Sequence, residues 1–394
     1  MKILYVAMPF SIHTARWLSQ LSGSNWDIHL FPSMPFQPLH RNISNVTYHE
    51  NFYNNIYPEV KGNVYSSPVL PALSFLKSPL AKKAFRYFAS ISNIEKGAAE
   101  KLAQVIMKVK PDIIHSLETQ HAGYLVKESK KLMAGPFPTW IHSNWGIDLH
   151  FFGQLQEHIE PIRETLAGID ILLVEGKRDE HLARRFGFDK KIYTFPSVGG
   201  GFLIPSAPLV PVAKRNKILI KGMQDLVRRG LVGIRALERC IDLLDSYEIL
   251  LYSADEVTRA AAESFYQRTG KKITVCGSLS QEDMLNLNAQ ARINLCVNAS
   301  DGLPNAMLEA MLMGAFPVQS NTSLADEWII NGKNGFLVPP EDPDVIEVAL
   351  RIILNDDDLC NEAAIYNRAL ISERLEYSSI KSSVIKMYEQ IISQ

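Results

Sequence analysis

The sequence is organised around the stretch DGLPNAMLEAM at residues 301–311, which runs on to GAFPV at residues 314–318. The apolar run INLCV at residues 293–297 precedes it and is typical of a buried strand in a parallel sheet. Gly302 and Pro304 break this strand into a tight loop, and good helix formers follow until the next glycine. The stretch therefore predicts a strand, an acidic glycine loop, a short helix and a second strand.

This predicted arrangement is one that binds ligands in α/β proteins. Open parallel sheets bind their ligands where a loop leaves the carboxyl end of a strand and enters a helix. The free N–H groups in the first turn of such a helix can take a phosphate or a negatively charged sugar oxygen. We therefore expect the loop at residues 301–305 to line a ligand site.

The two acidic residues of the stretch resemble a family signature. Asp301 and Glu309 are similar in spacing to the Glu, seven residues, Glu signature of retaining nucleotide-sugar glycosyltransferases of family 4, which have the two-domain GT-B fold. Asp301 stands where the family has the first Glu. The resemblance implies that Glu309 holds the donor through its ribose and that Asp301 contacts the sugar. The resemblance also implies that the four residues after Asp301 contact the donor, namely Gly302, Leu303, Pro304 and Asn305. The alternative is an ordinary loop and helix whose Glu caps or forms a salt bridge.

Composition limits the class of protein. The 394 residues suggest two to three domains, and 46% hydrophobic with 21% charged residues is the profile of a soluble globular protein. A formal net charge of −1 provides no basic field for nucleic acid, and no apolar run is long enough to span a membrane. The four cysteines form no C-x-x-C pair, so we expect reduced core residues of a cytosolic protein.

The predicted fold is α/β, with two Rossmann-like doubly wound domains that face a cleft. A proline-rich segment, PSAPLVP at residues 205–211, is typical of an interdomain linker. We expect an acceptor-side domain over residues 1–204 and a nucleotide-sugar donor domain over residues 205–375. Residues 376–394 are expected to form a helix that crosses back to the first domain, as in GT-B folds.

Two segments of the first half resemble family elements that face the cleft. Ser11 opens an S-x-H-x-x-R-W-like pattern that contains His13, and the loop at residues 143–148 resembles a W-G-S-D loop. The resemblance makes His13, His142 and Asp148 candidate contacts of the acceptor or donor. The alternatives are a capped surface helix for His13 and a satisfied histidine at a strand end for His142.

A basic amphipathic pattern covers residues 73–88. Leucine and phenylalanine alternate there with lysine and arginine, which is typical of a helix on an anionic membrane surface. Pro79 interrupts the pattern. We therefore favour the alternative, a helix packed on the domain with a solvated basic face, over peripheral contact with the membrane.

The second half contains a candidate phosphate clamp. Lys221 and Arg229 resemble a K-G-Y-x-x-x-x-G-R pattern, in which the two cations neutralise the donor diphosphate. Arg suits paired phosphate oxygens and Lys suits a point contact. If the alignment with this pattern shifts by one residue, Arg228 takes the place of Arg229. The alternative to a phosphate clamp is a solvated basic turn. In the family, the loop that contains Gly277 and Ser278 meets the nucleotide base through backbone atoms.

The resemblance implies a cytoplasmic, metal-independent, retaining hexosyltransferase that needs no cofactor. It would move a sugar from a nucleotide sugar to a glycan or lipid-linked saccharide, in the synthesis of cell-surface polysaccharide. We expect the three aspartates at residues 356–358 to form a solvated turn between helices and not a metal site. A GT-B nucleotide-sugar epimerase and a catalytically silent glycosyltransferase-like partner protein remain the alternatives.

Overall fold

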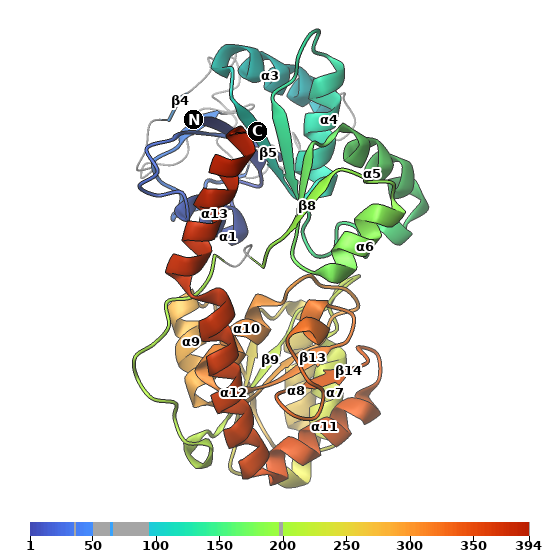
Figure 1. Ribbon diagram of the computed structural model, residues 1–394. Helices are drawn as coiled ribbons and strands as arrows, with labels where there is room; N and C mark the ends of the chain where they lie inside the picture. The colour runs from blue at the N-terminus through green and yellow to red at the C-terminus, as the bar shows by residue number, and fades with distance from the viewer. Residues whose placement is uncertain (35–36, 50–63, 66–93, 197–199, 394) are drawn as a thin grey trace. The chain divides into compact units, whose positions relative to one another are not determined.

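The computed structural model describes residues 1–394 apart from residues 35–36, 50–63, 66–93, 197–199 and 394 (Figure 1). The predicted amphipathic segment at residues 73–88 lies outside the described residues. The chain divides into two compact units, each with its own sheet and core. Unit 1 comprises Met1–Gly201 and Ser378–Gln394, and unit 2 comprises Phe202–Tyr377.

The described part of unit 1 contains an eight-stranded parallel sheet in the order β4-β3-β2-β1-β5-β6-β7-β8. Its strands are β1 (Lys2–Ala7), β2 (Asp27–Pro32), β3 (Thr47–His49), β4 (Val64–Tyr65), β5 (Ile113–Leu117), β6 (Thr139–Ser143), β7 (Ile171–Val174) and β8 (Lys191–Thr194). Its helices are α1 (Ile12–Ser19), α3 (Ile94–Val109), α4 (Tyr124–Lys131), α5 (Gln156–Gly168), α6 (Lys177–Arg185) and α13 (Tyr377–Ile392), and two short helical turns are η2 (Thr119–Gly123) and η3 (Phe152–Gln154).

Helices cover both faces of this sheet, as its apolar strands require. Leu4, Ile114 and Trp140 lie on one face and pack with buried side chains of α3, α4 and α5. Tyr5 and His115 point to the other face, because successive side chains of a strand alternate. This second face is covered by α1 and α13.

The hydroxyl of Tyr388 joins α13 to that second face. It lies 2.7 Å from the Tyr5 hydroxyl and 2.5 Å from Nδ1 of His115, and it accepts a hydrogen bond from Nε1 of Trp17 at 3.1 Å. All four side chains are buried, and burial raises the pKa of Tyr388 well above its usual value. One polar atom thus connects β1, β5, α1 and the C-terminal helix within the core of unit 1.

Unit 2 contains a six-stranded parallel sheet in the order β11-β10-β9-β12-β13-β14. Its strands are β9 (Lys217–Lys221), β10 (Glu248–Tyr252), β11 (Ile273–Val275), β12 (Ala291–Cys296), β13 (Phe316–Ser320) and β14 (Phe336–Val338). Its helices are α7 (Gly230–Glu238), α8 (Glu256–Thr269), α9 (Gln281–Gln290), α10 (Asn305–Met313), α11 (Pro343–Asn355) and α12 (Asp357–Leu375), and its short helical turns are η4 (Val212–Lys214), η5 (Ile241–Leu243) and η6 (Leu324–Glu327).

Two hydrophobic clusters lie on the two faces of this second sheet. Ile218 and Ile220 of β9 pack with buried residues of α7, α8 and α11, whereas Leu219 packs with Ala310 of α10. Both units therefore have the doubly wound α/β architecture that the sequence predicts. No helix in the described residues is long and apolar enough to cross a membrane.

The three aspartates at residues 356–358 lie where α11 ends and α12 begins, and all three are exposed. Asp356 caps α12 by accepting from the backbone N–H of Leu359. Asp357 also pairs with the buried Arg292 of β12 at 2.5 Å, so this segment is tied to the sheet.

We expect Tyr388→Phe to destabilise unit 1 by about 1 to 3 kcal/mol, because it leaves buried polar partners unsatisfied. Urea unfolding followed by tryptophan fluorescence measures the effect, since Trp17 lies in this cluster. Tyr266→Phe is the matched control, because Tyr266 is 49% exposed. Equal unfolding midpoints for the two variants would contradict the structural role of the hydroxyl.

Candidate functional site

The order of strands in unit 2 brings the predicted donor loops together. The chain moves from β9 to β10 and β11 on one side and returns to β12, β13 and β14 on the other, so β9 and β12 flank the topological switch point. The loops that follow these two strands are hydrogen-bonded to each other. Arg229 N donates to Val297 O at 3.0 Å, and Ala299 N donates to Val227 O at 2.6 Å. The switch point thus lies between the two stretches that the sequence singled out.

Lys221 is the last residue of β9 and is half-buried at this edge. Within the described part of the chain, its ammonium group makes no hydrogen bond or ion pair. Its charge lowers the pKa of the nearby Cys296 thiol, although burial raises that pKa overall. The structure therefore places an unpaired cation next to the loop that contains Asp301.

Arg229 lies at the start of α7 and is held by its own loop. Its Nε pairs with Glu341, and its Nη1 donates to the carbonyls of Asp225 at 3.0 Å and Leu226 at 3.2 Å. The neighbouring Arg228 pairs with the Asp225 carboxylate at 2.5 Å. Both arginines already have a carboxylate partner, so a phosphate would have to compete for them. This arrangement distinguishes them from Lys221.

Asp301 shapes the loop that it begins. Its Oδ2 accepts from Nδ2 of Asn298 at 2.9 Å, and its Oδ1 accepts from the backbone N–H of Gly302 at 2.9 Å. The backbone N–H of Asp301 donates to the carbonyl of Thr322 at 3.4 Å. The half-buried carboxylate thus accepts hydrogen bonds from its own loop. It also lies close enough to Cys296 for its negative charge to raise the pKa of that thiol.

The first turn of α10 has no side-chain cap, because Pro304 occupies the N-cap position. Its free N–H groups and the helix dipole favour an anion there. Asn305 begins the helix, and its Oδ1 is buried without a hydrogen-bond partner in the described residues. Glu309 is only 6% exposed, and its charge contributes to the raised pKa of Tyr252, for which burial is the main cause. Leu303 is buried, so it supports the loop by packing.

Gly277 and Ser278 lie further from the switch point. They follow β11, the edge strand, and β10 separates that strand from β9. Both residues are exposed. The structure therefore does not place them in the same loop contacts as Lys221 and Asp301, and their role at the base stays a prediction.

Two buried polar residues near Lys221, Tyr252 and Asn294, are not predicted as part of a site from the sequence. The Tyr252 hydroxyl lies 3.0 Å from Sγ of Cys296 and donates to Oδ1 of Asn294 at 3.1 Å. From the sequence alone, Cys296 is expected to be an ordinary core residue. Asn294 and Cys296 alternate with the apolar Ile293 and Leu295 in β12, and this alternation is the signal that could have indicated polar side chains on one face.

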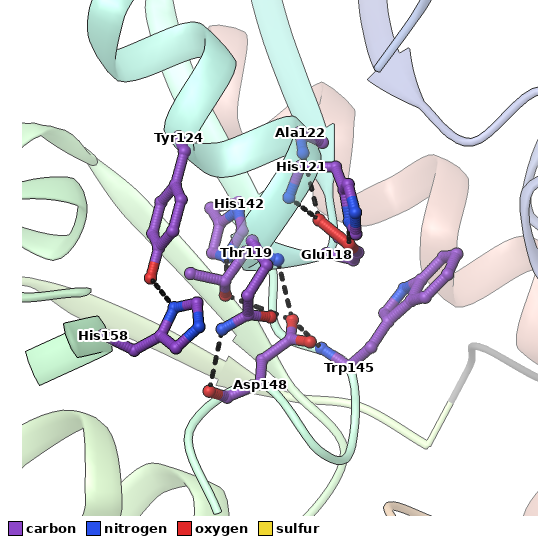
Figure 2. A network of polar contacts seen from close by, with 10 residues as sticks. Glu118, Thr119, His121, Ala122, Tyr124, His142, Trp145, Asp148 and His158 are labelled. Atoms are coloured by element: carbon purple, nitrogen blue, oxygen red, sulfur yellow. Dashed lines mark hydrogen bonds and ion pairs between the residues drawn. The ribbon is translucent and has the colours of Figure 1, made fainter. Parts of the chain in front are cut away.

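In unit 1, the loops after β5 and β6 form a polar network (Figure 2). Oδ2 of Asp148 accepts from the backbone N–H groups of Thr119 and Trp145, both at 2.8 Å, and from Oγ1 of Thr119 at 3.1 Å. Asp148 is 2% exposed, and its burial, with the charge of Glu118, raises its pKa well above the usual value. Asp148 thus joins the two loops at the carboxyl edge of the sheet.

His142 is fully buried at the end of β6. Its Nδ1 lies 2.8 Å from Oγ of Ser116, and its Nε2 lies 2.9 Å from Oγ1 of Thr119 (Figure 2). Burial lowers its pKa to about 3, so the ring is neutral at physiological pH. These contacts favour the alternative interpretation, a satisfied histidine at a strand end, over direct contact with a substrate.

The same edge contains polar residues that the sequence analysis did not select. Glu118 has φ 80° and ψ 152°, a backbone conformation that residues other than glycine rarely adopt. Its buried carboxylate accepts from the backbone N–H of Ala122 at 3.0 Å and lies 2.8 Å from Nδ1 of His121. His13 lies edge-on to Trp145, with ring centroids 5.4 Å apart. The contacts of Glu118 lie within one loop, whereas the contact of His13 with Trp145 joins distant segments and has no local motif.

The described residues include no group of three or more His, Cys, Asp or Glu side chains placed to hold a metal ion.

We expect Gly230→Ala to destabilise unit 2 by about 1 to 3 kcal/mol, the cost of overpacking. A Cβ at Gly230 would lie 2.3 Å from the carbonyl oxygen of Gly222, so the two ends of the loop between β9 and α7 would have to separate. Hydrogen exchange of β9 and α7 measures the effect. Gly277→Ala is the control, because no atom lies within 4 Å of its added Cβ. Equal protection in both variants would contradict the tight approach.

A second prediction concerns pH. The pKa of His142 is about 3 in the folded protein and about 6.5 when exposed, so the unfolded state binds the extra proton between these values. This contribution to stability is complete above pH 6.5 and is lost as pH falls, by about 1.4 kcal/mol per pH unit. The raised pKa of Asp148 acts in the opposite direction, because the folded state retains that proton. The difference between the wild type and a variant therefore isolates the histidine.

His142→Gln is the appropriate variant, since glutamine can still bond to the hydroxyls of Ser116 and Thr119. We expect its unfolding free energy to depend less on pH between 6.5 and 4.5 than that of the wild type, by up to about 2 to 3 kcal/mol across the interval. Urea unfolding at each pH measures this. Parallel curves would show that His142 is not neutral in the folded protein.

Comparison with known proteins gives a family match over part of the chain and a fold shared over the whole chain. Residues 221–356 match the family model for glycosyl transferases group 1, a segment that runs from Lys221 through Glu309. A search of curated proteins gives no significant match.

Solved structures resemble the whole chain. Sucrose-phosphate synthase from Thermosynechococcus elongatus is 16% identical, with a TM-score of 0.73 over 100% of this chain and 99% of that chain. HepE from Anabaena, in complex with UDP-glucose, is 13% identical, with a TM-score of 0.69 over 99% and 100% of the two chains. The lipopolysaccharide outer core galactosyltransferase WaaB is 14% identical, with a TM-score of 0.65 over 99% and 100%. The family match and the shared fold support a glycosyltransferase of the two-domain GT-B type.

Proposed function

We propose that this protein is a retaining glycosyltransferase of the family 4 type, which moves a sugar from a nucleotide sugar to a glycan or lipid-linked saccharide. The observation that carries the proposal is the ammonium group of Lys221, which has no partner among the described residues and lies at the switch point of unit 2, next to the loop that leads into α10. Both features lie in the segment that matches the glycosyltransferase family model.

The chemistry that this site would supply is stabilisation of a leaving group. Departure of a nucleoside diphosphate leaves negative charge on phosphate oxygens, and fixed donors aimed at that charge lower the barrier. Lys221 would provide a point charge, and the N–H groups of α10 would provide oriented dipoles. Arg229 would join them by exchanging Glu341 for phosphate, since that ion pair is its only carboxylate contact in the described residues.

The remaining roles follow the same division between the units. In unit 2, Glu309 would hold the donor and Asp301, whose carboxylate already orders its loop, would contact the sugar. In unit 1, His13 and Asp148 are the candidate acceptor contacts. A similar structure that contains UDP-glucose supports a nucleotide-sugar donor, and a similar lipopolysaccharide galactosyltransferase supports a saccharide acceptor in cell-surface polysaccharide synthesis. We further propose that the reaction needs neither metal nor cofactor, and that it takes place in the cytoplasm.

The experiment that tests this function is donor turnover without metal. The full chain is incubated with UDP-, GDP- and ADP-sugars in the presence of EDTA, and released nucleoside diphosphate is measured. We expect release from one donor, and we expect Lys221→Ala to lower kcat/KM by about 100-fold, the scale for removing one group that stabilises developing charge. Glu309→Gln should lower it as well.

Lys217→Ala is the matched control. Lys217 lies at the other end of β9 and already pairs with Glu248, so its loss should leave turnover unchanged. Equal effects of the two lysine variants would contradict the role of Lys221. If no donor turns over and none raises the melting temperature, the chain is a silent partner protein. Conversion of the donor sugar to its epimer would instead identify an epimerase.

A further inference from the structure

The ends of three neighbouring strands in unit 2 form a polar row. Tyr252 ends β10, Lys221 ends β9 and Cys296 ends β12. The Cα of Tyr252 pairs with that of Lys221, and Asn294 pairs with Leu219 one pleat earlier. Because side chains two residues apart share a face, Lys221 and Cys296 emerge on the same face as Asn294 and Tyr252.

The Tyr252 side chain crosses β9 on this face. Its hydroxyl donates to Oδ1 of Asn294 at 3.1 Å and lies 3.0 Å from Sγ of Cys296. Both partners belong to β12, which lies two strands away from β10, a separation of about 9.5 Å. The phenol ring therefore spans β9 on the face that carries Leu219 and Lys221.

Hydrogen bonds hold this ring in place. Sγ of Cys296 also donates to Oδ1 of Asn294 at 3.3 Å, and Nδ2 of Asn294 donates to Oδ1 of Asn288 at 2.7 Å. Nδ2 of Asn288 in turn donates to the carbonyl of Met284 at 2.9 Å, within α9. Tyr252 is 5% exposed and Cys296 is 2% exposed. The ring is thus fixed at its hydroxyl by a buried chain that ends in a helix.

The support below Lys221 is uncharged. Burial is the main reason that the pKa values of Tyr252 and Cys296 are raised, so both groups keep their protons at physiological pH. An uncharged support forms no ion pair with the lysine, so its ammonium group remains available. The ring crosses the face of β9 that Lys221 shares with the apolar Leu219, and a flexible lysine stem tends to lie along such apolar surface where it is open.

We propose that Tyr252, held by Asn294 and Cys296, is a positioning residue that keeps the Lys221 side chain directed toward the carboxyl edge of the sheet, where it binds the diphosphate of a nucleotide. This inference rests on the proposed function. Without the ring, the methylene groups of Lys221 can lie on the apolar surface near Leu219, which withdraws the charge from a phosphate at the loop.

The experiment compares ligands with and without phosphate on the full chain. Calorimetry measures the Kd of UDP, GDP and ADP and of the matching nucleosides. We expect Tyr252→Leu to raise the Kd of the diphosphate that binds by about five- to tenfold, and that of its nucleoside by less than about twofold. Tyr252→Phe keeps the ring and should remain within about twofold of the wild type for both ligands. A general loss of structure would weaken both ligands equally.

A double-mutant cycle tests whether Tyr252 acts through Lys221. In a Lys221→Ala background, Tyr252→Leu should no longer change the Kd of the diphosphate, because the charge that it positions is absent. Tyr266→Leu is the control for loss of a tyrosine ring, since Tyr266 is 49% exposed on α8. If Tyr252→Leu does not fold, Cys296→Ala replaces it in the cycle, with an expected loss of about two- to threefold.

The outcomes separate this inference from the proposed function. Additive effects in the cycle, or equal losses of diphosphate and nucleoside affinity, would overturn the positioning role and leave the donor site intact. If the wild type binds none of the three diphosphates, the proposed donor site is wrong and the positioning inference is wrong with it.

Discussion

The parallel pairing of β9 with β12 is the constraint on which the candidate site of unit 2 depends. It aligns Ile220 with Leu295, and this register brings the loops after the two strands into contact. Gly222 and Gly230 allow the loop after β9 to fold closely, because a Cβ at Gly222 would meet Leu251, and one at Gly230 would meet the Gly222 carbonyl, at less than 3 Å. A slip of the register by one residue would turn Lys221 away from Cys296 and Tyr252. The arrangement of charges at the site is therefore a consequence of strand register.

The three cations at this edge of the sheet differ in their interaction partners. Arg228 and Arg229 each pair with a carboxylate, whereas Lys221 has none in the described residues. Arginine presents several donors in a rigid fork, so it can bind a carboxylate and several carbonyls at once and order a loop. Lysine presents a compact charge on a flexible stem, which needs support from its surroundings to point in one direction. A paired arginine and a supported lysine are thus two solutions to holding positive charge at one edge.

The edge of unit 1 is polar in a different way. Asp148 and His142 are buried, each with hydrogen-bond partners, and burial shifts the pKa of each toward its uncharged form. Such a network holds two loops in a single arrangement, because a lost partner would leave a buried polar group unsatisfied. Glu118 retains an unfavourable backbone conformation within it, which the contacts to its carboxylate compensate. Hydrogen bonds therefore hold the two loops of this network together.

By itself, the sequence determined the local order of elements. The hydrophobic period and the positions of glycine and proline act over a few residues, so they predict the strand, loop and helix around Asp301. They also predict the start of α1 at Ser11 and the alternation of strands and helices. Only the tertiary structure decided which residues meet. Tyr388 contacts residues near the beginning of the chain, Tyr252 reaches Cys296 across β9, and Arg229 pairs with Glu341. These contacts depend on strand order and register, which bring distant segments together and leave no local pattern in a single sequence.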